Sequence, residues 1–273
     1  MACNLACPFC FSKSSVSSLD NEYANWNSLP VEQYYEYAAA HGATRLVITG
    51  GGEPLLRPRD VVSLISRARP FFAEIACFTN GTFLTEALAE ELAGAGLTYL
   101  CYSRHHHEDE LCARLMGHGT PRLEDFVQAA GPLKIRATCV MAQGFIDSPA
   151  AVWSYIETLV PLGVREFTFK HTYVAFEHSV FGASLENDWA RRHRVAFDPF
   201  EGQGETVFQL PWGPRVRRVP FGSDTIQVCY YQEPTPAWEQ ENRLCRSTNL
   251  LSDGTVYASL EDHRSRLFQL KRC

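Results

Sequence analysis

The stretch CNLACPFCF, residues 3–11, places three cysteines within eight positions: Cys3, Cys7 and Cys10. Thiolates at spacings of four and three residues can wrap one loop around a single inorganic centre. These residues alone leave three interpretations open. A zinc ion needs a distant histidine or cysteine as fourth ligand, a cubane iron–sulfur cluster keeps one iron without a protein ligand, and packing alone makes the thiols inert.

The composition is typical of a globular protein and excludes two kinds of partner. The chain has 273 residues, 45% of them hydrophobic, and a formal net charge of −6. We expect no nucleic-acid partner, because phosphates are neutralised by an excess of Lys and Arg. We expect no membrane partner, because no uncharged apolar run reaches about 18 residues. No signal-peptide pattern precedes Cys3, so we expect a cytoplasmic protein, and clustered cysteines there indicate metal binding or catalysis.

A second motif, ITGGGEPLLRP at residues 48–58, follows the apolar segment TRLVI. Three consecutive glycines let the backbone turn sharply and approach a ligand closely at the end of a strand. Glu53 then presents a carboxylate that suits the ammonium group of a ligand. Alone this motif indicates only a turn, but it gains weight because it follows the three cysteines.

Strand-like and helix-like segments alternate along the first part of the chain. β-branched and aromatic residues predict strands, and apolar residues at helical spacing predict helices. The strands are expected at 44–48, 74–78, 97–102, 134–141 and 165–170, and the helices at 31–41, 60–69, 85–96 and 150–163. Strand–helix–strand units of this kind predict a parallel sheet, covered by helices on its faces.

The pattern changes after about residue 172, which predicts two domains, 1–172 and 173–273. The second is expected to be a small α+β extension. Its predicted elements are a helix at 184–196, strands at 204–210 and 214–219, and a hairpin at 249–260 whose turn is Ser-Asp-Gly.

Taken together, the two motifs resemble those of the radical S-adenosylmethionine (SAM) superfamily. The match is Cys-x3-Cys-x2-Cys at residues 3–10 and Gly-Gly-Glu-Pro at residues 51–54. The resemblance implies a partial (β/α)6 TIM-like barrel. Only two residues precede Cys3, which leaves the presence of the barrel's first strand open. It also implies one [4Fe–4S] cluster held by the three cysteines. That cluster would cleave SAM reductively to a 5′-deoxyadenosyl radical, which abstracts hydrogen from a substrate.

The resemblance also assigns residues to the cofactors. Cys3, Cys7 and Cys10 would bind the cluster. The residues expected to contact SAM are Phe9, Gly51, Gly52, Glu53, Thr79, Asn80, Ser103 and Arg104. Phe9 would lie near the adenine, and Glu53 with its two glycines would bind the methionine amino group. Arg104 and His105 stand where the family has Leu-Asp, so the family's ribose-contacting carboxylate has no obvious counterpart.

Candidate catalytic side chains follow the predicted strands at their carboxyl ends. They are His105, His106, His107, Arg136 and His171, with Lys170 as the neighbour of His171. Adjacent strand residues point to opposite faces, so at most two of the three consecutive histidines can face one site. The alternative is a polar loop whose histidines face solvent.

The segment CRSTNLLSDGTVYASL, residues 245–260, resembles the twitch or SPASM-type extensions of the superfamily, and more loosely the tail of the molybdenum-cofactor GTP cyclase. Ser259 occupies the position where that family's pattern ends in cysteine. We therefore expect a remnant that closes the barrel mouth. An auxiliary cluster at Cys229, Cys245 and Cys273 is not expected. The cyclase's terminal Gly-Gly is missing, so its substrate is not carried over.

These observations predict an enzyme of a specialised pathway that acts on a small molecule: an amino acid, a sugar or a nucleotide. A reductase or flavodoxin-type protein would be its electron donor. Two alternatives stay open. One is a peptide-modifying enzyme, because extensions of this kind often serve peptides, and the other is a non-catalytic zinc-binding regulator that uses the same cysteines.

Overall fold

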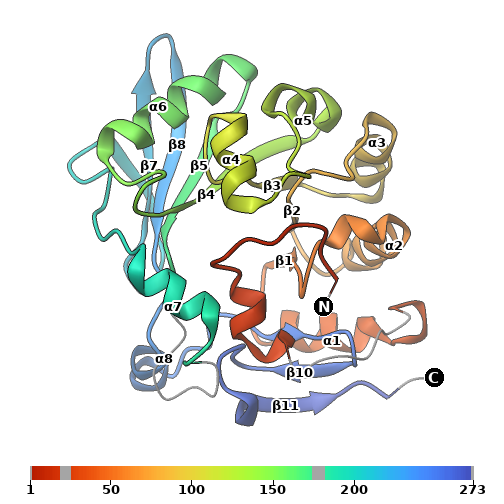
Figure 1. The fold of residues 1–273 in the computed structure, drawn as a ribbon. Coiled ribbons are helices and arrows are strands. Elements are labelled where there is room, and N and C mark those ends of the chain that lie inside the picture. The colour runs from red at the N-terminus through yellow and green to blue at the C-terminus, as the bar shows by residue number, and fades with distance from the viewer. Residues whose placement is uncertain (1, 19–25, 174–181, 272–273) are drawn as a thin grey trace.

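The computed structural model describes residues 2–18, 26–173 and 182–271. Its main sheet has eight strands in the order β1-β2-β3-β4-β5-β8-β7-β6 (Figure 1). Strands β1 to β5 pair in parallel, and β8 pairs in parallel with β5. Strand β7 pairs antiparallel with both β8 and β6. The sheet comprises β1 (Arg45–Ile48), β2 (Glu74–Thr79), β3 (Tyr99–Ser103), β4 (Lys134–Met141), β5 (Glu166–His171), β6 (Glu205–Gln209), β7 (Arg215–Phe221) and β8 (Asp224–Tyr231).

Eight α-helices occur in the described ranges, and helices α2 to α6 form the outer layer over the parallel strands (Figure 1). The α-helices are α1 (Val31–Ala40), α2 (Pro58–Ala68), α3 (Glu86–Ala95), α4 (Asp109–Met116), α5 (Leu123–Ala130), α6 (Pro149–Leu159), α7 (Leu185–Arg192) and α8 (Pro236–Asn242). The 3-10 helices are Phe11–Ser14, Val16–Ser18, Trp26–Ser28, Pro54–Leu56, Val160–Leu162 and His263–Ser265. None of the helices in these ranges is long and apolar enough to cross a bilayer.

Local signals account for where several helices begin. Thr85 and Ser148 each cap a helix, because their side chains accept the backbone N–H of Leu88 and Ala151. Helix α2 begins at Pro58, before the predicted residue 60, since proline suits the first turn of a helix. Helices α5 and α8 and strands β8 and β11 were absent from the sequence-based expectation.

The parallel strands have two chemically different faces. Residues Tyr102, Cys139 and Phe169 point toward the helices and belong to the main hydrophobic core. Because neighbours on a strand alternate, Ser103 and Lys170 point to the opposite face, which we call the inner face. The N-terminal loop lies on this inner side of the arch of strands (Figure 1). This mainly parallel arrangement confirms the predicted partial TIM-like barrel.

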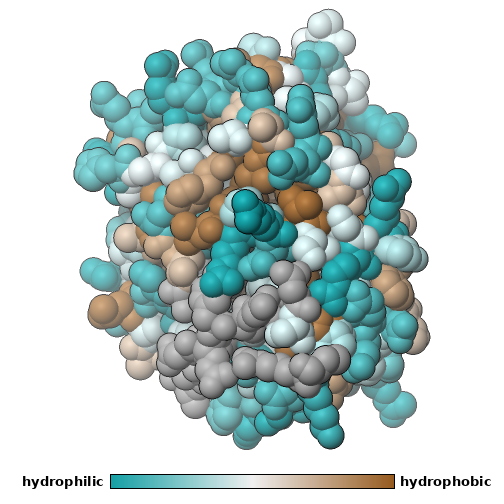
Figure 2. All heavy atoms as spheres, turned by 90° about the vertical axis from the view of Figure 1, so that its right-hand side faces the viewer, coloured by the Kyte–Doolittle hydropathy of each residue, from teal (hydrophilic) through white to brown (hydrophobic). Residues whose placement is uncertain are grey.

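Strand β1 is an edge of the sheet, and no strand precedes it among the described residues. In place of a first strand there is one parallel bridge between Ala2 and Gly52, and the Glu53 N–H donates to the Ala2 carbonyl at 2.9 Å. Val47 on β1 is 40% exposed. Figure 2 shows apolar side chains gathered among polar ones on the face that lies on the right of Figure 1.

The tail contributes to the main sheet and also forms a small sheet of its own. Strand β8 pairs in parallel with β5, so the main sheet continues past residue 172. The small sheet joins β9 (Asn249–Leu250), β10 (Thr255–Tyr257) and β11 (Arg266–Gln269) in antiparallel fashion. The first two form the predicted hairpin. The division of the chain into domains 1–172 and 173–273 stays a prediction.

Candidate functional site

The cysteine loop is anchored to helix α4. Leu5 packs against Cys112 and Met116, and the Ala6 N–H donates to the Met116 carbonyl at 2.9 Å. Within the loop, the Cys10 N–H donates to the Cys7 carbonyl at 3.3 Å. The loop therefore has a defined position over the parallel strands.

The three thiols are free and electrostatically coupled. Cys3 is exposed, and Cys7 and Cys10 are partly buried. Burial, together with the neighbouring thiols of Cys10 and Cys3, raises the pKa of Cys7 to about 12. Burial also raises the pKa of Cys3. Thiols held together in this way lose their protons readily only when a cationic metal centre compensates the charge.

The cysteine loop offers three thiolate donors from one short segment. Among the described residues, the only group of three ligands close enough together for one metal ion is His106, His107 and Glu108, and the three cysteines form no such group. A cubane places its irons at separate corners, so its ligands lie further apart than those of one zinc ion. The donor set, three free thiols on one loop, fits a [4Fe–4S] cluster.

Glu53 is a buried carboxylate that ties the ends of β1 and β2 together. It is 7% exposed, and burial raises its pKa. Its Oε1 accepts the Leu55 N–H at 3.0 Å and the Thr79 hydroxyl at 2.7 Å, and its Oε2 accepts the Asn80 N–H at 2.8 Å. A carboxylate has about four acceptor positions, so one position is left for a further donor.

Asn80 continues this network to the cysteine loop. Its Nδ2 donates to Asn4 Oδ1 at 3.0 Å and lies 4.0 Å from Cys3 Sγ. The glycine-rich loop approaches from the other side: at Gly52 φ is +139°, and a Cβ there would lie 1.9 Å from the Ala2 carbonyl oxygen. Only glycine permits this approach. The fold thus brings together residues that are nearly eighty positions apart in sequence.

Phe9 is enclosed by aromatic side chains from two other elements. Its ring centroid lies 4.8 Å from that of His105 and 5.5 Å from that of Trp189 on α7. His105 Nδ1 accepts the Val140 N–H at 3.0 Å, and burial lowers the pKa of His105 to about 3. His105 is therefore a neutral packing partner of Phe9. Trp189 was missed from the sequence, where nothing local connects α7 with residue 9.

The side chain of Arg104 does not reach the predicted cofactor site. It is 0% exposed, and its guanidinium donates to Tyr102, to the carbonyl oxygens of His107 and Pro121, and to Asp109 at 2.5 Å. All of these partners lie on the helix side of the sheet or in the loop that follows β3. Arg104 has a structural role here, since strand alternation turns it away from the inner face.

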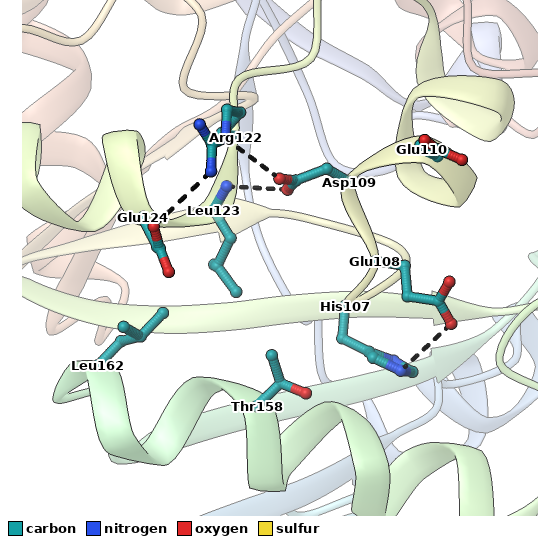
Figure 3. Close-up of a pocket in the computed structure, with 9 residues that line it drawn as sticks. All are labelled: His107, Glu108, Asp109, Glu110, Arg122, Leu123, Glu124, Thr158 and Leu162. Atoms are coloured by element: carbon teal, nitrogen blue, oxygen red, sulfur yellow. Dashed lines mark hydrogen bonds and ion pairs between the residues drawn. The ribbon is translucent and has the colours of Figure 1, made fainter.

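His106 and His107 also lie away from the inner face. Their rings stack at 4.5 Å, and burial lowers the pKa of His106 to about 4. Figure 3 shows His107 and Glu108 beside a separate cavity of about 390 Å³ between α4, α5 and α6. That cavity is lined by His107, Glu108, Asp109, Glu110, Arg122, Leu123, Glu124, Thr158 and Leu162.

Two further candidates, Arg136 and His171, have different surroundings. Arg136 lies on the inner face, where it pairs with Glu166 at 2.7 Å and donates to the Tyr99 hydroxyl at 3.0 Å. His171 has its ring 6.3 Å from that of Tyr230, and its Nδ1 is buried without a partner. Because residues alternate along β5, the neighbouring Lys170 rather than His171 points to the inner face.

The two tail cysteines among the described residues, Cys229 and Cys245, have different surroundings. Cys229 is buried on β8, and Cys245 Sγ donates to the carbonyl oxygens of Ser247 at 2.9 Å and Ala258 at 3.3 Å. Neither belongs to a group of three ligands that could hold an ion. Cys273 lies outside the described residues.

The fold and the site together define a class of protein: an α/β partial barrel whose N-terminal three-thiol loop is joined by a buried carboxylate network to a glycine-rich loop. A family model described as "Radical SAM superfamily" matches residues 1–141, and the chain belongs to the radical SAM superfamily. A [4Fe–4S] cluster and SAM are accordingly its cofactors.

Similar proteins include cyclases of two kinds. A probable GTP 3′,8-cyclase of Thermococcus kodakarensis is 28% identical over 166 residues, which are 59% of this chain and 51% of the relative. A PqqA peptide cyclase of Xanthomonas axonopodis pv. citri is 31% identical over 143 residues, 50% of this chain and 37% of the relative. The chain thus spans about half, or less, of the length of these relatives.

Solved structures show the same fold at low identity. The crystal structure of Streptococcus suis SuiB bound to the precursor peptide SuiA aligns with a TM-score of 0.58 and 15% identity, over 96% of this chain and 58% of SuiB. At this identity the likeness concerns the fold alone. It nevertheless includes the tail, because the aligned share extends well beyond residue 172.

Proposed function

We propose that this chain is a radical SAM enzyme that abstracts a hydrogen atom from a small molecule bound at the inner face of the sheet. The observation that carries the proposal is the hydrogen-bond network from Glu53 through Asn80 to Asn4 and Cys3. It joins the loop that would bind SAM to the loop that would bind the cluster. When bound, the cluster supplies the electron that cleaves SAM to the radical that abstracts hydrogen.

The chain's own residues would bind SAM, orient it and shield it from water. Glu53 offers its remaining acceptor position to the ammonium group of SAM, and Gly51 and Gly52 let the backbone approach that group closely. Phe9, held between two aromatic rings, provides an apolar surface for the adenine. Thr79 orients Glu53 through its hydroxyl group. Ser103 points to the inner face of the sheet.

The tail and the loop after the cysteines would exclude water from this region. The Val16 N–H donates to the Leu260 carbonyl at 2.8 Å, and Val16 packs against Leu251, Tyr257 and Leu260. These contacts place the tail beside the cysteine loop, as expected of a remnant that covers the barrel mouth. We further propose that the protein is cytoplasmic and that a reductase or flavodoxin-type donor supplies the electron.

A peptide substrate is the second candidate. One relative is named a PqqA peptide cyclase, and the structural neighbour SuiB was crystallised with a precursor peptide. The small-molecule proposal is supported by the cyclase relative named for GTP. The two candidates differ in a direct way, because a peptide enzyme needs a short precursor that co-purifies with it or is encoded beside it.

The decisive experiment is anaerobic reconstitution with iron and sulfide, followed by reduction in the presence of SAM. We expect about four irons per chain, visible absorption of a cubane centre, and formation of 5′-deoxyadenosine. Changing Cys3, Cys7 or Cys10 to Ala should abolish all three. A protein that holds one zinc per chain and never cleaves SAM would be the regulator instead, and about eight irons would indicate a second cluster.

A further inference from the structure

The inner face of the sheet carries polar residues in rows, because the strands pair in parallel and in register. One row consists of Ser103, Thr138, Thr168 and Cys229 on β3, β4, β5 and β8. The next row toward the carboxyl ends contains Lys170. Three side chains of the first row are small and bear hydroxyl groups, which is unusual for a surface that helices would otherwise fill with apolar residues.

The charges in the row below are already neutralised. Glu166 accepts hydrogen bonds from Arg136 and forms an ion pair with Lys134. The Tyr99 hydroxyl accepts a further hydrogen bond from Arg136. The charged groups of this row therefore have partners of their own. A ligand at the inner face would meet the row of hydroxyl groups above it instead.

Thr138 has an unused hydroxyl group. The residue is 5% exposed, and its Oγ1 is buried without a hydrogen-bond partner. Burying a hydroxyl group without a hydrogen-bond partner is unfavourable. An unsatisfied buried group of this kind indicates a place where a ligand atom completes the hydrogen bonding.

Lys170 provides a positive charge next to this hydroxyl. Its Nζ lies 4.7 Å from the centre of the Tyr231 ring and 3.8 Å from Glu233 Oε1, a loose ion pair. The other oxygen of Glu233 is bound by Arg246 and accepts the Tyr231 hydroxyl. One carboxylate is thus shared between two cations and is held more closely by the arginine.

The electrostatics of Lys170 agree with that geometry. Burial and, to a smaller extent, the charge of Arg246 lower its pKa to about 8, although the thiols of Cys101 and Cys229 act in the opposite direction. Both thiols lie on strands whose alternation puts them on the inner face, the face that carries Lys170 and Thr138. The side chain is still 31% exposed, which leaves it open to a ligand.

We propose that Lys170 and Thr138 bind a carboxylate group of the substrate. Thr138 on β4 is opposite Thr168 on β5, so Lys170, two positions further along β5, is its diagonal neighbour. Diagonal neighbours on adjacent strands lie roughly 7–8 Å apart, and a carboxylate with one hydrogen bond of about 2.8 Å on each side spans about that distance. One incompletely paired ammonium group matches the single charge of a carboxylate better than the multiple charges of a phosphate chain. This inference rests on the proposed function, because it deepens the substrate class of the same site.

The test measures binding rather than turnover, by ligand-observed NMR on the cluster-loaded protein with SAM and without reductant. One set of probes consists of free amino acids and their amides. The other consists of N-acetyl tripeptides with a free or an amidated carboxyl terminus. We expect at least one free carboxylate to bind about tenfold more tightly than its amide. The set that binds shows whether the carboxylate belongs to a small molecule or a peptide.

Substitutions assign the effect to the two residues. Lys170→Met should abolish the preference for the carboxylate, Lys170→Arg should retain most of it, and Thr138→Val should weaken binding several-fold. Lys134→Met, at the opposite end of the same face, is the matched control and should change nothing. Circular dichroism confirms that each variant is folded.

Two results would overturn the inference: no probe binds at millimolar concentration, or amides bind as tightly as carboxylates. These outcomes are separate from the failure of the proposed function. A chain that cannot cleave SAM can still prefer a carboxylate through Lys170, and an active enzyme can show no such preference.

Discussion

Removing the carboxylate of Glu53 tests the network on which the site depends. Glu53→Ala leaves three donors without their acceptor, the N–H groups of Leu55 and Asn80 and the hydroxyl of Thr79. Each unsatisfied buried donor costs about 1–3 kcal/mol. Burying the carboxylate is itself unfavourable, as its raised pKa shows, so part of the loss is offset. We expect the free energy of unfolding to fall by about 4 kcal/mol.

Glu53→Gln separates geometry from charge. Its carbonyl oxygen can keep the two donors that Oε1 now accepts, from Leu55 and Thr79. Its NH2 group would face the Asn80 N–H, a contact between two donors. We therefore expect a smaller loss of stability, about 2 kcal/mol, with a large loss of SAM affinity because the negative charge is gone.

Urea unfolding of the cluster-free protein and equilibrium dialysis of SAM with the cluster-loaded protein measure the two effects. Glu90→Ala, on the exposed surface of α3, is the control and should change neither. If Glu53→Ala unfolds at the wild-type urea concentration, the network does not stabilise the fold. If Glu53→Gln binds SAM as the wild type does, Glu53 has no role in binding the cofactor.

Three further predictions concern single residues. Arg104→Met should lower the free energy of unfolding by about 3–5 kcal/mol in urea titrations, while the SAM affinity measured by dialysis stays unchanged. Weaker SAM binding in a stably folded variant would show that Arg104 contributes to the cofactor site. Gly52→Ala should sharply reduce iron incorporation, because the positive φ and the Ala2 carbonyl both oppose a Cβ at this position. Gly144→Ala is the control: its φ is +83° but the space around it is open, so the free energy of unfolding should fall by only about 1 kcal/mol. Equal iron contents in the two variants would contradict this prediction. The pKa of Lys170 is lowered from 10.5 to about 8. Between these two pH values the unfolded chain binds more protons than the folded chain, so the free energy of unfolding should rise with pH across that interval. The rise should be smaller in Lys170→Met, and identical pH profiles of the two proteins would refute the prediction.

The order of strands and helices in the body of the chain could be predicted because its signals are local. Segments such as 134–141 are rich in β-branched residues, and helices such as α3 begin at a capping threonine. Strand β8, with the sequence DTIQVCYY, has the same local signal and was overlooked. Its parallel pairing with β5, about sixty residues away, could not be predicted. No local pattern encodes a partner at that distance.

What the sequence determined by itself is the cofactor chemistry. Three cysteines within one loop and a glycine-rich turn ending in Glu53 are short-range features, and their spacing is sufficient for a cluster and its ligand. Only the tertiary structure decided which side chains face that chemistry. Strand alternation and register turned Arg104 to the helix side and Lys170 to the inner face, and long-range packing placed Trp189 against Phe9. The direction in which a side chain points and its distance from remote segments are set only in the assembled sheet. Both properties decide which residues can contact a substrate.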